Sequence, residues 1–136
     1  MPDSTKPSSA PCCGRVKTIL LVEDDLDFGE TIAEGIEDML PYRVLVVASG
    51  LEALRLVRTH PPDLFLLDYR LPGMDGLELY THLHATRGLE QVSVLFLTAY
   101  PFTLGLKGKS PRLTSLEKPI DFSKLLWCID EMLADR

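Results

Sequence analysis

The sequence has few cysteines, no long hydrophobic run and no excess of positive charge, and each shortage excludes a class of protein. No apolar run approaches the roughly 20 residues of a membrane-spanning helix, and the first residues lack the hydrophobic region of a signal peptide. With 14 basic against 20 acidic residues, the net charge of −6 argues against a phosphate-binding nucleic-acid surface. We therefore expect neither a membrane nor a nucleic acid as a partner.

The three cysteines do not form a disulfide framework or a zinc site. Cys12 and Cys13 are adjacent in a leader rich in proline and serine, residues 1–16, which we expect to be disordered. Cys128 has helical spacing among apolar residues, which is typical of a packing residue. All three cysteines fit a reducing cytoplasm, which is the location that we expect.

The rest of the chain, residues 17–136, is long enough for one domain with a substantial core. Strand and helix patterns alternate along it. Strands are predicted at 17–25, 42–49, 63–68, 92–98 and 113–119, and helices at 27–40, 50–60, 76–88 and 122–136. Most of these strands are apolar throughout, which indicates a parallel sheet with helices on both faces. The pattern predicts an α/β fold, a flavodoxin-like doubly wound sheet of five parallel strands in the order 2-1-3-4-5.

Some helices of this fold are less regular or less clearly packed than others. The stretch 99–112 holds glycines and prolines with little periodicity, so the fourth helix should be short or irregular. The first helix is expected to pack through an apolar face made of Phe28, Ile32, Ile36, Met39 and Leu40. Trp127, in the last helix, is expected to pack rather than to bind a partner.

Polar residues follow the carboxyl ends of four predicted strands. The first strand ends in Glu23 and Asp24, the third in Asp68, the fourth in Thr98 and the fifth in Lys118. In a doubly wound sheet these ends meet at the edge where ligands bind. Oxygen ligands without histidine or cysteine suit a hard cation, above all Mg²⁺. Without a cation the neighbouring carboxylates repel one another, and some are driven toward protonation.

This set of side chains suits phosphoryl transfer to a carboxylate. A carboxylate oxygen attacks a phosphoryl group and forms an aspartyl phosphate, a reaction that mainly requires positioning and charge neutralisation. Asp68 is the predicted nucleophile, Lys118 a positive charge beside the phosphoryl oxygens and Thr98 a hydroxyl donor.

Four motifs, ILLVEDD, LLDYRLPGMDG, LFLTA and EKP, occur in this order along the chain. Together they resemble the receiver domain of bacterial two-component response regulators, over roughly residues 17–135. The resemblance implies that Asp68 is the phosphoacceptor and that Thr98 and Lys118 are the hydroxyl and the lysine of the family's catalytic set. It also implies a site for Mg²⁺ or Mn²⁺ with four ligands: Asp24, Asp68, the backbone carbonyl of Arg70 and, through water, Glu23.

The resemblance implies a signalling module that catalyses only its own aspartyl phosphorylation and dephosphorylation. The phosphodonor would be a phosphohistidine on a sensor kinase or a histidine phosphotransfer protein, and the target would be an unknown downstream protein. We expect a stand-alone receiver, with a fragment of a longer protein as the alternative. Two other functions stay open. One is an interaction scaffold that is never phosphorylated. The less favoured one is an aspartyl-phosphate hydrolase of the haloacid-dehalogenase type, in which an aspartate stands where this chain has Arg70.

Four positions near these motifs bear on how the site is used. The family usually carries an aromatic residue, which rotates on activation, three residues before the lysine, and here that residue is Ser115. Arg70 and Tyr100 stand at positions that vary within the family and tune the lifetime of the phosphoryl group. Both are bulky, so we expect them to shield that group from water, whereas the small Ala99 leaves room for the phosphodonor.

Other polar residues in these segments have simpler explanations. Asp25 and Asp27 are expected to cap the first helix rather than to bind metal. The pair Asp75–Gly76 is interpreted as a turn. His82 and His84 are two residues apart on a helix, hence on different faces, and both are expected to be solvated.

Overall fold

The chain forms a five-stranded parallel sheet in this computed structural model, which describes residues 16–69, 71, 73–98 and 113–134. The strands are β1 (Thr18–Val22), β2 (Arg43–Val47), β3 (Leu64–Asp68), β4 (Ser93–Thr98) and β5 (Leu113–Glu117). The helices of the described residues are α1 (Leu26–Met39), α2 (Gly50–Leu56), α3 (Gly76–His84) and α4 (Phe122–Leu133). The strand order is β2-β1-β3-β4-β5 and all pairs are parallel, so the predicted fold is confirmed.

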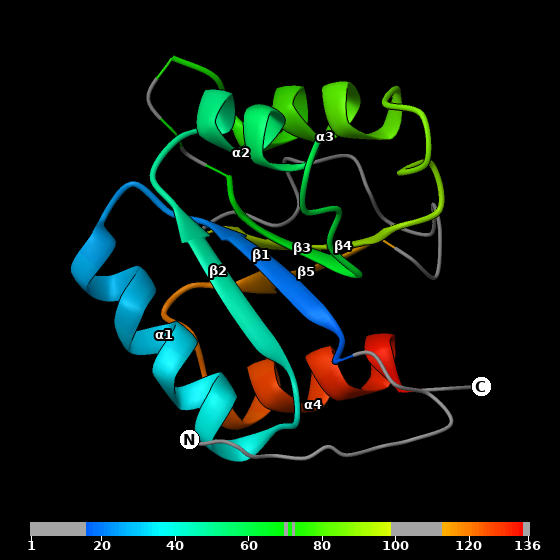
Figure 1. Cartoon of the computed structure of the whole chain (residues 1–136). Helices are drawn as coiled ribbons and strands as arrows, with labels where there is room; N and C mark the ends of the chain where they lie inside the picture. Colours follow the sequence, from blue (N-terminus) through cyan, green and yellow to red (C-terminus); the bar gives the residue numbers. More distant parts are fainter. Residues whose placement is uncertain (1–15, 70, 72, 99–112, 135–136) are drawn as a thin grey trace.

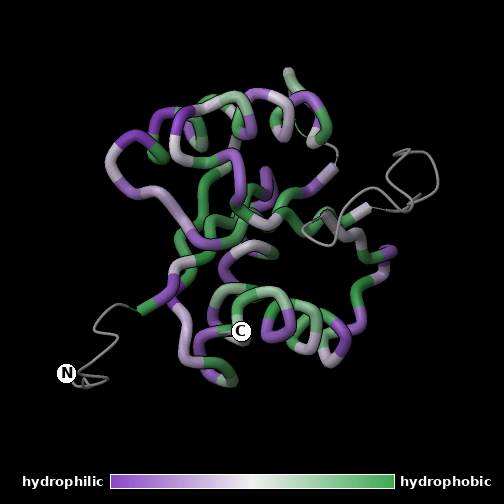
Figure 2. The backbone as a smooth tube through the Cα atoms, turned by 90° about the vertical axis from the view of Figure 1, so that its right-hand side faces the viewer, coloured by the Kyte–Doolittle hydropathy of each residue, from purple (hydrophilic) through white to green (hydrophobic). Residues whose placement is uncertain are grey.

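The sheet lies between two layers of helices (Figure 1). Helices α1 and α4 cover one face, and α2 and α3 cover the other. Successive residues of a strand point to opposite faces, so Leu66 packs toward α1 and α4 whereas Leu67 packs toward α2 and α3. Figure 2 shows the hydrophobic strands in the middle of the molecule, between the helical layers. Burial on both faces explains why the strands are apolar runs without alternation.

Each of these helices begins at a side chain that accepts a hydrogen bond from a backbone amide of the first turn. The N-caps are Asp25 for α1, Ser49 for α2, Asp75 for α3 and Asp121 for α4. A cap of this kind typically stabilises a helix by about 1 kcal/mol. The prediction that Asp25 caps α1 is therefore confirmed, and Asp27 lies in the first turn. The interpretation of Asp75–Gly76 as a turn is wrong, because Gly76 is the first residue of α3.

One prediction about side-chain packing is confirmed only in part, and another is wrong. The buried face of α1 is made by Gly29, Ile32, Ala33 and Ile36, which confirms the prediction for Ile32 and Ile36. Phe28 and Met39, at the ends of the predicted face, are 37% and 65% exposed. Trp127 in α4 is 64% exposed and does not pack in the core. Cys128 is half-buried against the core, as predicted.

The two histidines of α3 have different surroundings. His82 is exposed, as predicted, but His84 is half-buried. The centroid of the His84 ring lies 4.4 Å from that of Tyr80, and its Nε2 lies 3.2 Å from the carbonyl oxygen of Val92. The prediction that His84 is solvated is therefore wrong.

Several predictions concern residues outside the described part of the chain. The short or irregular fourth helix falls in 99–112, and Cys12 and Cys13 fall in 1–15. Among the residues that the structure describes, no helix has both the length and the apolar composition of a membrane span.

Candidate active site

The predicted site residues lie at the carboxyl ends of neighbouring strands. The described ones are Glu23 and Asp24 just after β1, Asp68 at the end of β3, Thr98 at the end of β4 and Lys118 just after β5. The register pairs Asp68 with Leu97 and Thr98 with Glu117, so that the ends of β3, β4 and β5 are nearly level. Four segments that are far apart in the sequence therefore meet at one edge of the sheet.

Three carboxylates converge at this edge. One oxygen from each of Glu23, Asp24 and Asp68 lies within 4.8 Å of the other two. Glu23 and Asp68 are only 3% and 4% exposed, whereas Asp24 is exposed. The cluster thus has two buried carboxylates and one that faces solvent.

Lys118 brings a positive charge to the cluster. Its Nζ donates a hydrogen bond to Oδ1 of Asp68 at 3.0 Å, which is also an ion pair. Its backbone amide donates to the carbonyl oxygen of Thr98 at 2.8 Å, which ties the ends of β4 and β5 together. The Lys118 side chain is 32% exposed, so it contacts both Asp68 and solvent. The peptide bond between Lys118 and Pro119 is cis.

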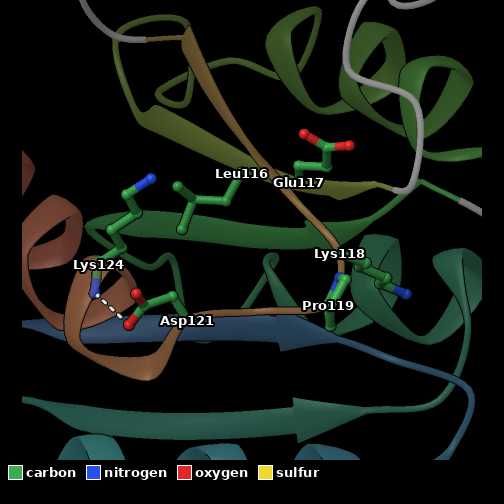
Figure 3. A pocket seen from close by; sticks show the side chains of 6 residues that line it. All are labelled: Leu116, Glu117, Lys118, Pro119, Asp121 and Lys124. Atoms are coloured by element: carbon green, nitrogen blue, oxygen red, sulfur yellow. Dashed lines mark hydrogen bonds between the residues drawn. The ribbon is translucent and has the colours of Figure 1, made fainter.

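A pocket of about 260 Å³ lies beside Lys118, between the end of β5 and the start of α4. Its lining residues are Leu116, Glu117, Lys118, Pro119, Asp121 and Lys124. In Figure 3 the Lys118 side chain extends away from the side chains of Asp121 and Lys124. Asp68, the ion-pair partner of Lys118, does not line this pocket. The pocket therefore adjoins the carboxylate cluster without being part of it.

Glu23 has the most perturbed electrostatics of the cluster. Its Oε2 accepts a hydrogen bond from the Asp25 amide at 3.1 Å, whereas its buried Oε1 has no hydrogen-bond partner. Burial raises the pKa of Glu23 to about 7. The nearby Asp68 carboxylate adds to this rise, while the Asp25 amide and Lys118 oppose it. Repulsion between Glu23 and Asp68, which the sequence predicts, therefore raises the pKa of Glu23 less than the loss of hydration does.

The raised pKa of Glu23 predicts how the stability of the metal-free protein depends on pH. The folded state holds a proton on Glu23 up to about pH 7, whereas the unfolded state releases it near 4.5. Unfolded chains therefore bind fewer protons between these values, and stability falls as the pH rises through them. Urea unfolding with a chelator should show a loss between about pH 5 and pH 8 that is roughly 1–3 kcal/mol larger in the wild type than in Glu23→Gln.

The matched control for this pH prediction is Glu30→Gln, because Glu30 is an exposed acid on α1. Its loss of stability with pH should equal that of the wild type. An equal loss in Glu23→Gln and the wild type would show that Glu23 is charged in the folded protein throughout this range.

Some predicted residues remain untested by this geometry. Arg70, Ala99 and Tyr100 lie outside the described residues, so the carbonyl ligand and the shielding of the site stay predictions. Sequence patterns also gave no sign that Gly76 and Tyr69 contact one another next to Asp68, where the Gly76 amide donates to the Tyr69 carbonyl at 2.6 Å. The only signal was an Asp-Gly pair, which is typical of many turns.

Comparison with known proteins agrees with this arrangement of strands and side chains. Residues 19–129 match the sequence model of the response regulator receiver domain. The chain belongs to this family. Receiver domains of response regulators act in two-component signalling, and the aspartate, lysine and acidic pair described above lie within the matched residues.

Relatives of this receiver domain are similar over most of its length. The polar-differentiation response regulator DivK of Brucella ovis is 30% identical in an alignment 125 residues long, which covers 88% of this chain and 98% of DivK. The signal receiver domain of a histidine kinase from Syntrophus aciditrophicus has a TM-score of 0.76 at 26% identity, with 88% of this chain and 91% of that chain covered.

A third relative contains a metal ion. It is the receiver domain of a sensor histidine kinase from Pseudomonas aeruginosa, which holds a magnesium ion coordinated in its active site cleft. Its TM-score is 0.73 at 28% identity, and the comparison covers 89% of this receiver and all of that chain.

Proposed function

We propose that this receiver domain accepts a phosphoryl group on Asp68 from a phosphohistidine of a sensor kinase or a histidine phosphotransfer protein. Phosphorylation then changes how the domain binds a downstream protein, and the proposed place of action is the cytoplasm. The observation that carries the proposal is the 3.0 Å ion pair between Asp68 and Lys118 at the edge of the carboxylate cluster. A nucleophilic carboxylate, a cation beside it and a further acidic pair are what phosphoryl transfer to aspartate requires.

The carboxylate cluster also fits a divalent cation, Mg²⁺ or Mn²⁺. Its ligand atoms are all carboxylate oxygens, which hard cations prefer. The buried Oε1 of Glu23 lacks a hydrogen-bond partner, and such an oxygen is costly unless another group satisfies it. Asp24 and Asp68 are the proposed direct ligands. Glu23 would contact the cation through water, and the Arg70 carbonyl is a further predicted ligand. When bound, the cation would neutralise charge on the phosphoryl oxygens.

The residues of the chain have distinct roles in the proposed reaction. A carboxylate oxygen of Asp68 attacks phosphorus, while the bond from phosphorus to the imidazole nitrogen of the donor breaks and its electron pair stays on that nitrogen. The Lys118 ammonium, already 3.0 Å from Asp68, balances negative charge on the transferred group. The Thr98 hydroxyl donates to a phosphoryl oxygen. Water later hydrolyses the aspartyl phosphate, which releases phosphate and restores the carboxylate. Both reactions take place on Asp68, so the domain has no other substrate residue in this proposal.

The proposed function is tested by incubating the protein with Mg²⁺ and acetyl phosphate and following its intact mass over time. A phosphoryl adduct that persists for minutes supports a signalling receiver. Rapid release of phosphate without an adduct would favour the hydrolase, and neither adduct nor release would favour the scaffold. The three functions therefore give three different time courses.

Mg²⁺ is expected to stabilise the folded protein, because the unfolded chain does not bring the three carboxylates together. A cation at ten times its dissociation constant adds about 1.4 kcal/mol to the free energy of unfolding. In a domain of this size the melting temperature should rise by roughly 3–7 °C. The measurement is a thermal melt with increasing MgCl₂ at constant ionic strength.

Asp24→Asn is the control for the magnesium prediction, since it removes the charge of an exposed ligand and leaves the buried residues in place. Its melting temperature should respond much less to Mg²⁺. A wild-type protein whose melting temperature does not change up to tens of millimolar Mg²⁺ would argue against the cation site.

A further inference from the structure

We propose that Gly76 is a positioning residue for Asp68. Because Gly76 has no side chain, the first turn of α3 lies directly against the backbone of Asp68 and Tyr69, and this contact holds the end of β3 in place. The inference rests on the proposed function of Asp68 as the phosphoacceptor.

The contact leaves no room for a side chain. Gly76 is buried, and its amide donates a hydrogen bond to the Tyr69 carbonyl oxygen at 2.6 Å. A Cβ atom at this position would lie 2.8 Å from Cα of Tyr69 and 2.9 Å from the carbonyl oxygen of Asp68. Cβ atoms in proteins essentially never lie within 3.0 Å of a non-bonded heavy atom, so both contacts are strong overlaps. They involve backbone atoms, which cannot be relieved by rotating a side chain.

The surroundings of this contact have little freedom to move. The same Cβ atom would lie 3.1 Å from Cε1 of Phe96, which is fully buried. The Phe96 ring packs edge-to-face against Tyr69 and Tyr80, with centroids 6.5 and 6.0 Å apart. On the other side, the Tyr69 amide donates to a carbonyl oxygen of β4 at 2.9 Å. A side chain at position 76 must therefore displace either α3 or the end of β3.

Displacement of α3 alone would be costly, because its first turn is anchored. Leu79 of this turn is fully buried in the core, and the Gly76 amide is hydrogen-bonded to the Tyr69 carbonyl at the end of β3. Part of the strain is thus expected to fall on the backbone of Asp68 and Tyr69.

A shift at the end of β3 changes the site directly. Glu23 and Lys118 follow β1 and β5, so a shift of the end of β3 alone changes their distances to Asp68. The 3.0 Å ion pair and the convergence of the carboxylates would both be disturbed. Misplacing a reacting group by about 1 Å costs up to about 100-fold in rate. Gly76 thereby supports the reaction although it touches no reacting atom.

The test compares Gly76→Ala with Gly35→Ala. Gly35 lies in α1 on the opposite face of the sheet (Figure 1), and a Cβ atom there would overlap the Phe122 ring. Both substitutions add a methyl group where a helix is crowded, but only the one at Gly76 overlaps the backbone of the acceptor. Acetyl phosphate labelling with Mg²⁺, well below each melting temperature, and crystal structures of both variants are the measurements.

Gly76→Ala is expected to become phosphorylated at least about tenfold more slowly than the wild type, with a changed distance between Asp68 Oδ1 and Lys118 Nζ. Gly35→Ala should keep the wild-type rate within about twofold, however much its melting temperature falls. A wild-type rate in Gly76→Ala, with Asp68 in place, would overturn the inference. If the wild type itself is never phosphorylated, the proposed function fails, and the position of Asp68 in the crystal structure of Gly76→Ala still decides the positioning role.

If Gly76→Ala does not fold, the double variant Gly76→Ala/Phe96→Leu replaces it in both measurements. The smaller side chain removes the ring overlap and leaves the backbone overlaps. Its reference is Phe96→Leu alone. Slower labelling and a displaced Asp68 in the double variant support the inference, and equal rates with an unmoved Asp68 overturn it.

Discussion

Asp68→Asn is expected to abolish phosphoryl transfer to this protein while the fold survives. The two side chains have nearly the same shape, but the neutral amide lacks the charged oxygen that attacks phosphorus. During a reaction that fully labels the wild type, the variant should gain no phosphoryl mass, a loss in rate of roughly 10³-fold or more. Circular dichroism should show unchanged secondary structure, because the apolar residues of β3 keep their places in the core.

Asp38→Asn is the matched control for this prediction, since Asp38 is an exposed aspartate on α1. It should be labelled as fast as the wild type. If Asp68→Asn gained one phosphoryl group at the normal rate, the acceptor would be another residue and the role of Asp68 would be wrong.

Lys118→Ala is expected to slow phosphorylation by roughly 10²-fold, because one preorganised donor to the developing charge is lost. Mg²⁺ binding should persist, since lysine is not a metal ligand and its removal takes a positive charge away from the carboxylates. The labelling rate and the magnesium-dependent melting temperature measure the two effects separately.

The control for Lys118→Ala is Lys124→Ala, which removes an exposed lysine from the other side of the same pocket. Its labelling rate should equal that of the wild type. Normal labelling of Lys118→Ala would mean that the ion pair with Asp68 has no part in the reaction.

The sheet and the edge that carries the site could be predicted from the sequence. An apolar run such as Leu64–Leu67 indicates a strand whose side chains are buried on both faces of the sheet. Burial on both faces is typical of parallel strands that lie between two layers of helices. Once the strands are parallel, residues at their carboxyl ends must meet, which placed Asp68 near Lys118, 50 residues away. Residues at the ends of regular elements were thus located by topology alone.

Features that depend on how elements pack could not be predicted. Periodicity included Phe28 and Met39 in the buried face of α1, but both side chains are exposed in the folded domain. The proximity of Gly76 to the backbone of Asp68 and the missing partner of the Glu23 Oε1 are distances between segments that no local pattern encodes.

Ser115 raises the question of how phosphorylation reaches a partner. It is half-buried in β5 and pairs in register with Phe96 of β4, whose ring packs toward α3. The resemblance to the family implies an aromatic residue at this position, which turns when the threonine moves. A serine is too small for that movement, so any coupling from Thr98 must use other side chains.

The central claim is that Asp68 itself carries the phosphoryl group. Reducing the labelled protein with borohydride converts an aspartyl phosphate to homoserine, and tandem mass spectrometry of its peptides then identifies the residue. We predict homoserine at position 68 in protein treated with acetyl phosphate and Mg²⁺, and none when the metal is chelated. Homoserine at another aspartate, or a labelled protein with none at position 68, would contradict the account.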